Sequence, residues 1–246
     1  MSSEASHATA VAIANGNEAT TEAAGSNHMR THVGDRPSKL VWVFAIMAIG
    51  GLVMESVQHI IAFGEWENRM GLIWGPFSPI YGLAALLLTA ILEPLQERST
   101  ALLFLVGAVV GGVLEYFTSW AMETFWGVVA WSYLEIPFNF DGRTDVFHCI
   151  IWGALGVLWI KVGLPLFERG FNRVNIKGLA YRAISALLAI FLVVDAFVTV
   201  TAMLRADART HGEPALTPLG QLYDQAYPNE VLQDRFGNMG GIGRAD

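Results

Sequence analysis

The chain contains five stretches of about 20 or more mostly apolar residues, and these restrict its fold more than any other feature. They cover residues 40–63, 72–92, 100–122, 146–167 and 183–204. A hydrocarbon core of ~30 Å is crossed by ~20 helical residues, and helices satisfy their own backbone hydrogen bonds in lipid. Only 15% of the residues are charged, against about 25% in soluble domains. The sequence therefore predicts an all-α, polytopic membrane helix bundle with about five transmembrane helices.

Polar segments flank this apolar region on both sides. Residues 1–36 are rich in Ala, Ser, Thr, Gly, Asn and Glu and contain no aromatic residue. Such a segment cannot bury a core and is expected to be disordered. We therefore divide the chain into a disordered N-terminal tail over 1–36, a transmembrane helix bundle over 37–204 and a largely polar C-terminal tail over 205–246.

Positive charges near the span ends predict the orientation in the membrane. With alternating spans, one face carries Arg30, Arg36, Lys39, Arg98, Arg169, Arg173, Lys177 and Arg182, and the other carries Arg69, Arg143, Arg205 and Arg209. Short cytoplasmic loops are enriched in Lys and Arg. The first face, which includes the N-terminus, is therefore expected to be cytoplasmic, and the C-terminal tail is expected on the other side.

Composition excludes several classes of function. A net charge of -7 offers no basic surface for nucleic acid. The single cysteine, Cys149, excludes an internal disulfide and a cysteine-cluster metal site. The phosphate loop G-x-x-x-x-G-K-[ST] does not occur, so any ATP hydrolysis would need a separate ATPase subunit. We expect no cofactor and no bound metal.

Several ionisable residues lie inside the predicted spans, where such groups are expensive and are functional candidates by default. In the alternating topology, Glu55, His59, Glu115 and Glu123 fall in the second halves of spans one and three. His148 falls in the first half of span four, which runs in the opposite direction. These residues are therefore expected to share one leaflet.

The spacing of these residues allows two interpretations. Glu55 and His59 are four residues apart on one helix face, and Ser119 lies midway between Glu115 and Glu123 on another. A carboxylate next to an imidazole is typical of proton relays in pumps and transporters. The alternative is that these groups pair with one another, or with Arg69 and Arg143, only to hold helices together. For Asp195, in the middle of span five, the choice is between a functional group and a packing contact.

Residues 68–82, NRMGLIWGPFSPIYG, interrupt the second span. Pro76 and Pro79 each lack a backbone donor, and three glycines loosen the backbone around them. We expect a broken, Gly/Pro-interrupted second helix whose free backbone groups are buried in protein or line a wet cavity, as at transporter binding sites. Ser78 and Tyr81 would face that cavity. The alternative is a long extracellular loop that enters the bilayer at Tyr81.

Residues 123–145 combine aromatic side chains with turn-forming and charged residues. The aromatic side chains suit a belt at the headgroup level. Beside them, five turn-forming or charged residues favour a compact lid over the cavity mouth: Asn139, Asp141, Gly142, Arg143 and Asp145. An interfacial turn with surface ion pairs is the alternative.

Several of these stretches resemble one known family. GLVMES, ENRMGLIWGPFSPIYG, VLEYFTSWAME and PFNFDGR followed by IIWG are similar to the bacterial ABC-transporter type IV, or CmpB-like, permease family, in the family's own order over about residues 45–166. The matching positions are Glu55, Asn68, Arg69, Gly71, Gly75, Pro76, Pro79, Ile80, Tyr81, Gly82, Glu115, Tyr116, Ser119, Glu123, Trp131, Tyr133, Phe138, Asn139, Gly142, Arg143, Trp152 and Gly153. The chain departs from the family at 130–134, where AWSYL replaces WWDYS. The resemblance implies a multi-pass protein of the bacterial inner membrane.

The leading functional hypothesis is a permease component that binds a small solute or ion in a polar cavity of one leaflet. The expected binding residues are Glu55, His59, Asn68, Arg69, Ser78, Tyr81, Glu115, Ser119, Glu123, Asn139, Arg143 and His148. One alternative is a non-transporting scaffold, assembly factor or sensor. Less favoured are an intramembrane acid–base enzyme using Glu115 or Glu123 with His148, and a metal site built from His59 and His148 with carboxylates.

Overall fold

The computed structural model describes residues 36–173, 178–237 and 239. The chain separates into two units, Met1–Lys39 and Leu40–Asp246, and the contacts below all lie within the second. The expected N-terminal tail lies outside the described residues apart from Arg36, as do Arg30 and Lys177 of the charge count.

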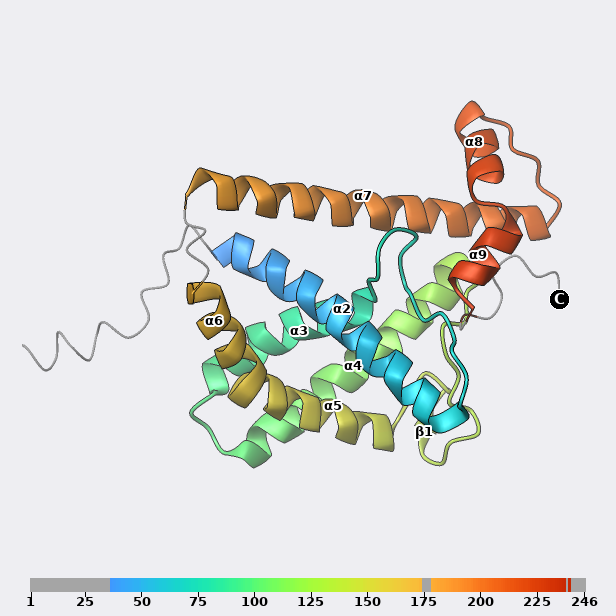
Figure 1. The fold of residues 1–246 in the computed structure, drawn as a ribbon. Coiled ribbons are helices and arrows are strands. Elements are labelled where there is room, and N and C mark those ends of the chain that lie inside the picture. The colour runs from blue at the N-terminus through green and yellow to red at the C-terminus, as the bar shows by residue number, and fades with distance from the viewer. Residues whose placement is uncertain (1–35, 174–177, 238, 240–246) are drawn as a thin grey trace, which may run out of the picture. The chain divides into compact units, whose positions relative to one another are not determined.

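Nearly all the regular structure is helical (Figure 1). The helices are α2 (Arg36–Phe63), α3 (Pro79–Leu92), α4 (Thr100–Trp126), α5 (Val146–Leu158), α6 (Leu164–Arg173), α7 (Leu179–Thr210), α8 (Pro218–Ala226) and α9 (Asn229–Arg235). A 3-10 turn, η1 (Glu93–Leu95), follows α3, and a π-helical segment, η2 (Trp159–Gly163), joins α5 to α6. A two-stranded antiparallel hairpin, β1 (Asn139–Phe140) with β2 (Thr144–Asp145), precedes α5.

The predicted all-α membrane bundle is confirmed. Within the described residues, four helices are long and apolar enough to cross a membrane: Arg36–Phe63, Thr100–Trp126, Val146–Phe171 and Leu179–Thr210. The second predicted span, 72–92, is instead a shorter apolar helix over Pro79–Leu95. At 1.5 Å per residue the 14 residues of α3 rise only ~21 Å, less than a hydrocarbon core.

The second span is shortened because the chain cannot form a helix before Pro79. Pro79 occupies the first turn of α3, where its missing N–H is not needed, and Gly75 adopts a positive φ of 70°. Leu72, Phe77 and Ser78 are nonetheless buried. The backbone N–H of Ser78 donates to the carbonyl of Ala48 on α2 at 3.1 Å. The interrupted part is therefore packed against protein, as expected for backbone that lipid cannot satisfy.

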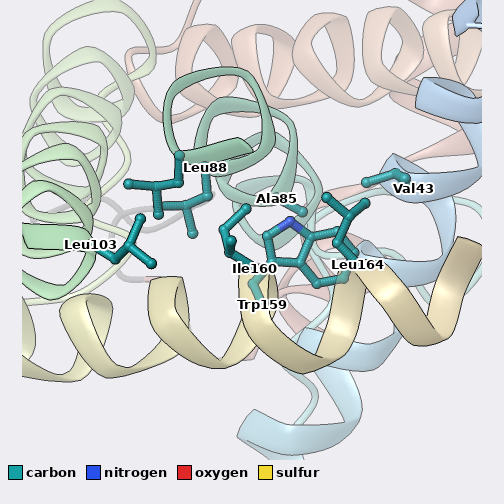
Figure 2. Close-up of a cluster of buried hydrophobic side chains, with 8 residues drawn as sticks. Val43, Ala85, Leu88, Leu103, Trp159, Ile160 and Leu164 are labelled. Atoms are coloured by element: carbon teal, nitrogen blue, oxygen red, sulfur yellow. The ribbon is translucent and has the colours of Figure 1, made fainter. Parts of the chain in front are cut away.

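The fourth predicted span is a single rod made of α5, η2 and α6. Trp159, in the π-helical segment, donates its indole N–H to Thr89 Oγ1 on α3 at 2.8 Å. Its ring belongs to the hydrophobic core shown in Figure 2, together with Ala85 and Leu88 of α3 and Ile160 and Leu164 of the rod. This core fixes α3 against the fourth span.

Glycines, which have no side chain, allow bulky aromatic rings to pack closely against the helices. A Cβ on Gly51 of α2 would lie 2.0 Å from Cγ of Tyr81, and one on Gly111 of α4 would lie 2.3 Å from Cγ of Trp152. Gly107 likewise faces the backbone of Gly153 on α5. Small residues of this kind bring membrane helices into close contact.

Helices α8 and α9 lie at the C-terminal end of α7 (Figure 1). Leu232 and Phe236 are fully buried in a cluster with Ala202, Met203 and Ala206 of α7. The C-terminal segment, expected to be largely polar, therefore contributes to an apolar core that it shares with α7.

The two neighbouring glycines of α2 give a matched test of this packing. Gly51→Ala is expected to destabilise the protein by about 1–3 kcal/mol, because its Cβ overlaps the Tyr81 ring and forces it to move. Gly50→Ala meets nothing within 4 Å and is expected to leave stability unchanged or slightly raised. Unfolding by SDS in mixed micelles measures both. Equal effects of the two variants would contradict the assigned contact.

Candidate functional site

Arg69 is the centre of the first polar cluster, the Glu55 cluster, which comprises Glu55, His59, Glu67, Arg69 and Tyr81. One guanidinium nitrogen, Nη1, donates to Glu55 Oε1 at 2.7 Å. The other, Nη2, lies 2.7 Å from Glu67 Oε2 and 2.8 Å from His59 Nδ1. Tyr81 completes the cluster by donating its hydroxyl to Glu55 Oε2 at 3.0 Å.

The hydrogen-bond donors of this cluster determine which ring nitrogen of His59 carries the proton. A guanidinium can only donate hydrogen bonds, so His59 Nδ1 must accept, and the imidazole is neutral with its proton on Nε2. That Nε2 lies 3.7 Å from Glu67 Oε2. With Glu55 and Glu67 ionised, the cluster holds two negative charges against the single positive charge of Arg69.

Glu115 is the centre of the second polar cluster, the Glu115 cluster, which comprises Glu115, Tyr133, Thr144 and Trp152. Tyr133 donates to Oε1 at 3.1 Å, while Thr144 and Trp152 donate to Oε2 at 2.7 and 3.3 Å. Glu115 itself is only 5% exposed. All three donors are neutral, and among the described residues no ion pair involves this carboxylate.

The hairpin before α5 brings Thr144 to Glu115. Asp141 and Gly142 have φ angles of 51° and 67°, and the N–H of Arg143 donates to the carbonyl of Phe140 at 2.9 Å. Positive φ at both central residues is typical of the tight turns that Asp-Gly favours. Residues 141–143 connect the two strands, and Thr144 lies opposite Phe140.

Asp145 and His148 support the Glu115 cluster from the start of α5. Asp145 caps the helix by accepting from the backbone N–H of His148 at 3.0 Å, and its other oxygen lies 2.5 Å from His148 Nδ1. The His148 ring stacks on Tyr133 at 4.1 Å between centroids. Burial alone would raise the pKa of Asp145, but the hydrogen bonds from His148 outweigh it and the pKa lies below its ordinary value. Burial and the Glu115 charge raise the pKa of Tyr133.

Tyr81 and Trp152 join the two clusters. Their ring centroids lie 6.3 Å apart, and each ring bonds to the carboxylate of its own cluster. A continuous series of contacts thus runs from Glu55 through Tyr81 and Trp152 to Glu115. It is built at the C-terminal halves of α2 and α4, the N-terminal end of α3 and the first half of the span Val146–Phe171.

The structure distributes the twelve predicted binding residues unequally. Glu55, His59, Arg69 and Tyr81 meet in one cluster, and Glu115 with His148 lies in or beside the other. Ser119 is buried one turn after Glu115 on α4, and Ser78 is buried just before α3. A solute-binding role stays a prediction for each of them.

The remaining predicted residues serve the surrounding loops. Glu123 forms an ion pair with Arg143 at 2.5 Å. Asn139 holds the hairpin, since its amide donates to the carbonyl of Ile136 at 2.8 Å and its oxygen accepts from the N–H of Gly142. Asn68 contacts the backbone of Asp234 at 3.4 Å. These geometries fit loop positioning and do not place these side chains on Glu55 or Glu115.

The sequence suggested Arg69 and Arg143 as partners of the acids, and Arg69 pairs with Glu55 and Arg143 with Glu123, but it did not assign the other groups that bind the carboxylates. Thr144, Tyr133 and Trp152 donate to Glu115, and Glu67 shares Arg69 with Glu55. The Asp-Gly pair at 141–142 was the available signal, because a hairpin there brings the next strand back against the preceding segment. Nothing local to Tyr133 or Trp152 indicates a bond to a distant glutamate.

A hollow of about 300 Å³ lies beside the Glu115 cluster, on the surface of α4, the hairpin and α5. It is lined by Val109, Gly112, Val113, Tyr116, Phe117, Phe140, Thr144 and Cys149. Its lining is almost wholly apolar, so it differs from the polar cavity that the sequence predicts. That polar cavity stays a prediction.

The fold and these clusters define a class of protein: a multi-helix membrane protein in which one buried and one partly buried acidic group are joined near one end of its helices. Residues 42–200 match the family described as "Putative ABC-transporter type IV". Because the match spans more than half of the chain, the protein belongs to this family of membrane transporter components, and the resemblance found in the sequence is confirmed. None of the curated proteins and none of the solved structures matches the chain significantly.

The lowered pKa of Asp145 predicts a specific pH dependence of stability. Its charged form stabilises the fold above the pKa of an unfolded aspartate, ~3.9, and this contribution is lost as the pH falls through the lower pKa of the folded state. Asp145→Asn keeps a capping acceptor but has no charge. The difference in free energy of unfolding between wild type and Asp145→Asn, from SDS titrations, is therefore expected to shrink as the pH falls below ~4.

Asp145→Ala separates the cap from the charge. It is expected to cost about 1 kcal/mol more than Asp145→Asn because the N-cap acceptor is also lost. A difference between wild type and Asp145→Asn that does not change with pH would contradict the assigned role of the charge.

Proposed function

We propose that this chain is the membrane-spanning component of a transporter, and that it binds a small solute or ion at the joined Glu55 and Glu115 clusters. The observation that carries the proposal is the series of contacts from Glu55 through Tyr81 and Trp152 to Glu115. Four helical segments converge on it. Transporter sites of this kind are commonly formed where a broken helix meets its neighbours.

The charge balance of the clusters favours a positively charged ligand or protons. The Glu55 cluster has one more carboxylate than guanidinium, and Glu115 is held by neutral donors alone. Uncompensated charge is expensive at membrane depth. A cation, a cationic group of a solute or a proton would reduce that cost.

Transport by an ABC mechanism would require a second protein. The sequence has no phosphate-binding loop, so ATP hydrolysis would come from a separate ATPase subunit. Location in a bacterial inner membrane, with a cytoplasmic N-terminus, completes the proposal and rests on the charge count and the family.

One observation favours a second candidate function, a non-transporting scaffold. Both oxygens of Glu55 and both oxygens of Glu115 accept hydrogen bonds from within the chain. A fully satisfied network of this kind rigidifies a core without any ligand. The experiment below is designed to separate the two functions.

Glutamine variants remove each charge while preserving the hydrogen-bond geometry. In Glu55→Gln, the amide oxygen can accept from Arg69 and the amide nitrogen can donate to the Tyr81 hydroxyl. In Glu115→Gln, the amide oxygen can accept from Thr144 and Trp152 while the nitrogen donates to Tyr133. We expect both variants to fold and both to lose uptake.

The measurement is uptake of a panel of radiolabelled cations, amino acids, amines and sugars into vesicles of the native membrane, which retain any ATPase partner, with and without ATP and a proton gradient. Glu135→Gln, an exposed acid in the loop before the hairpin, is the matched control and should retain uptake. Uptake that persists in Glu55→Gln and Glu115→Gln would contradict the proposed binding site. Product formation without flux would indicate an enzyme, and neither flux nor product would indicate the scaffold.

The ATPase partner can be tested separately. Affinity purification of the tagged chain from its native membranes, after mild crosslinking, is expected to recover a protein that carries a phosphate loop, together with vanadate-sensitive ATP hydrolysis. Uptake driven by an ion gradient in liposomes that contain only the purified chain would contradict this expectation, because no ATPase would then be required.

A further inference from the structure

Arg235 of α9 binds the backbone of the interrupted second span. Its Nε donates to the carbonyl of Leu72 at 3.0 Å, and its Nη2 donates to the carbonyl of Gly75 at 2.6 Å. Nearby, the amide of Asn68 donates to the carbonyl of Asp234 at 3.4 Å. These contacts join residues that are more than 150 positions apart in the sequence.

Helix α7 binds the backbone donors of the same segment. The N–H of Trp74 donates to Asp195 Oδ1 at 3.0 Å, and the N–H of Ile73 donates to Thr199 Oγ1 at 3.0 Å. Residues 72–75 are therefore held from both directions, with their carbonyls on Arg235 and their N–H groups on α7. Both sets of partners are side chains, so substitution can remove them one at a time.

The position of α9 is fixed independently of Arg235. Leu232 and Phe236 are 0% and 1% exposed in the core shared with α7, and Ile73 packs against that core. Burial lowers the pKa of Arg235, while the charge of Asp195 opposes this effect. Asp195 is fully buried, and its Oδ2 has no hydrogen-bond partner among the described residues. The Arg235 charge thus offsets a buried carboxylate as well as binding the carbonyls.

The segment that α9 holds is flanked on both sides by residues of the Glu55 cluster. Glu67 and Arg69 precede Leu72, and Tyr81 follows Gly75 at the start of α3. We propose that α9 is a clamp and that Arg235 is a positioning residue, which fixes Arg69 and Tyr81 against Glu55. The functional reason for this positioning rests on the proposed function, whereas the contacts of Arg235 do not depend on it. Arg235 lies beyond the residues of the family match.

Hydrogen–deuterium exchange tests the clamp directly. Arg235→Gln removes the charge and one arm of the guanidinium, so backbone exchange in peptides covering 70–78 is expected to accelerate about tenfold or more, since the carbonyls of Leu72 and Gly75 lose their charged donor. Exchange in 146–158 should not change. Arg235→Lys keeps the charge but cannot span both carbonyls, so its effect should be intermediate. Asp234→Asn is the matched control, because only its backbone is used.

A double-mutant cycle separates positioning from general stability. Arg69→Gln is expected to lower the midpoint of thermal unfolding less in an Arg235→Gln background than in wild type, because Arg69 is then already misplaced. If Arg235→Gln does not fold, Arg235→Lys serves in the same cycle. Additive shifts, unchanged exchange in 70–78, or faster exchange throughout the chain would each overturn the clamp.

These readouts do not depend on transport. If Glu55→Gln retains uptake while the exchange and cycle results hold, the proposed function fails and the clamp stands. If uptake is lost in Glu55→Gln but the cycle is additive, the proposed function stands and the clamp fails.

Discussion

Carboxylates within the helices of an apolar bundle must find donors inside the protein, and this requirement organises the site. Glu115 is 5% exposed and takes three neutral donors, while Glu55 takes a guanidinium and a phenol. An unsatisfied buried carboxylate is expensive because low-dielectric surroundings do not replace its hydration. The rings that supply these donors need room, and Gly51 and Gly111 provide it by lacking a side chain. Hydrogen bonding of the acids and close packing of the helices are therefore achieved by the same residues.

The interrupted second span obeys the same constraint through its backbone. Its N–H groups bind Asp195 and Thr199, and its carbonyls bind Arg235. A regular helix would have satisfied these groups by itself, but Pro76 and Pro79 prevent one. The cost is a dependence on α7 and α9, which lie far away in the sequence. This makes the C-terminal helices part of the architecture of the site.

Much of the fold follows from local sequence properties. Apolar length predicts the spans at 40–63, 100–122, 146–167 and 183–204, and Pro79 predicts the break in the second span. Alternation of spans predicts that Glu55 and Glu115 lie toward the same ends of their helices, and both clusters form there. The partners of Glu115 could not be predicted, because they lie 18, 29 and 37 residues away and meet only after the hairpin and α5 have packed. The contacts of Arg235 with residues 72–75 could not be predicted for the same reason, and Arg235 lies in a segment that was expected to be a largely polar tail.

The position of Tyr81 has a thermodynamic consequence for the two acids. Its hydroxyl donates to Glu55, while its ring lies next to the indole of Trp152, which donates to Glu115. Linkage is reciprocal. If a ligand bound at Glu55 changes the affinity for a ligand at Glu115, then binding at Glu115 changes the affinity at Glu55 by the same factor. Because the Tyr81 ring contacts Trp152, a ligand bound at one acid can alter the packing around the other.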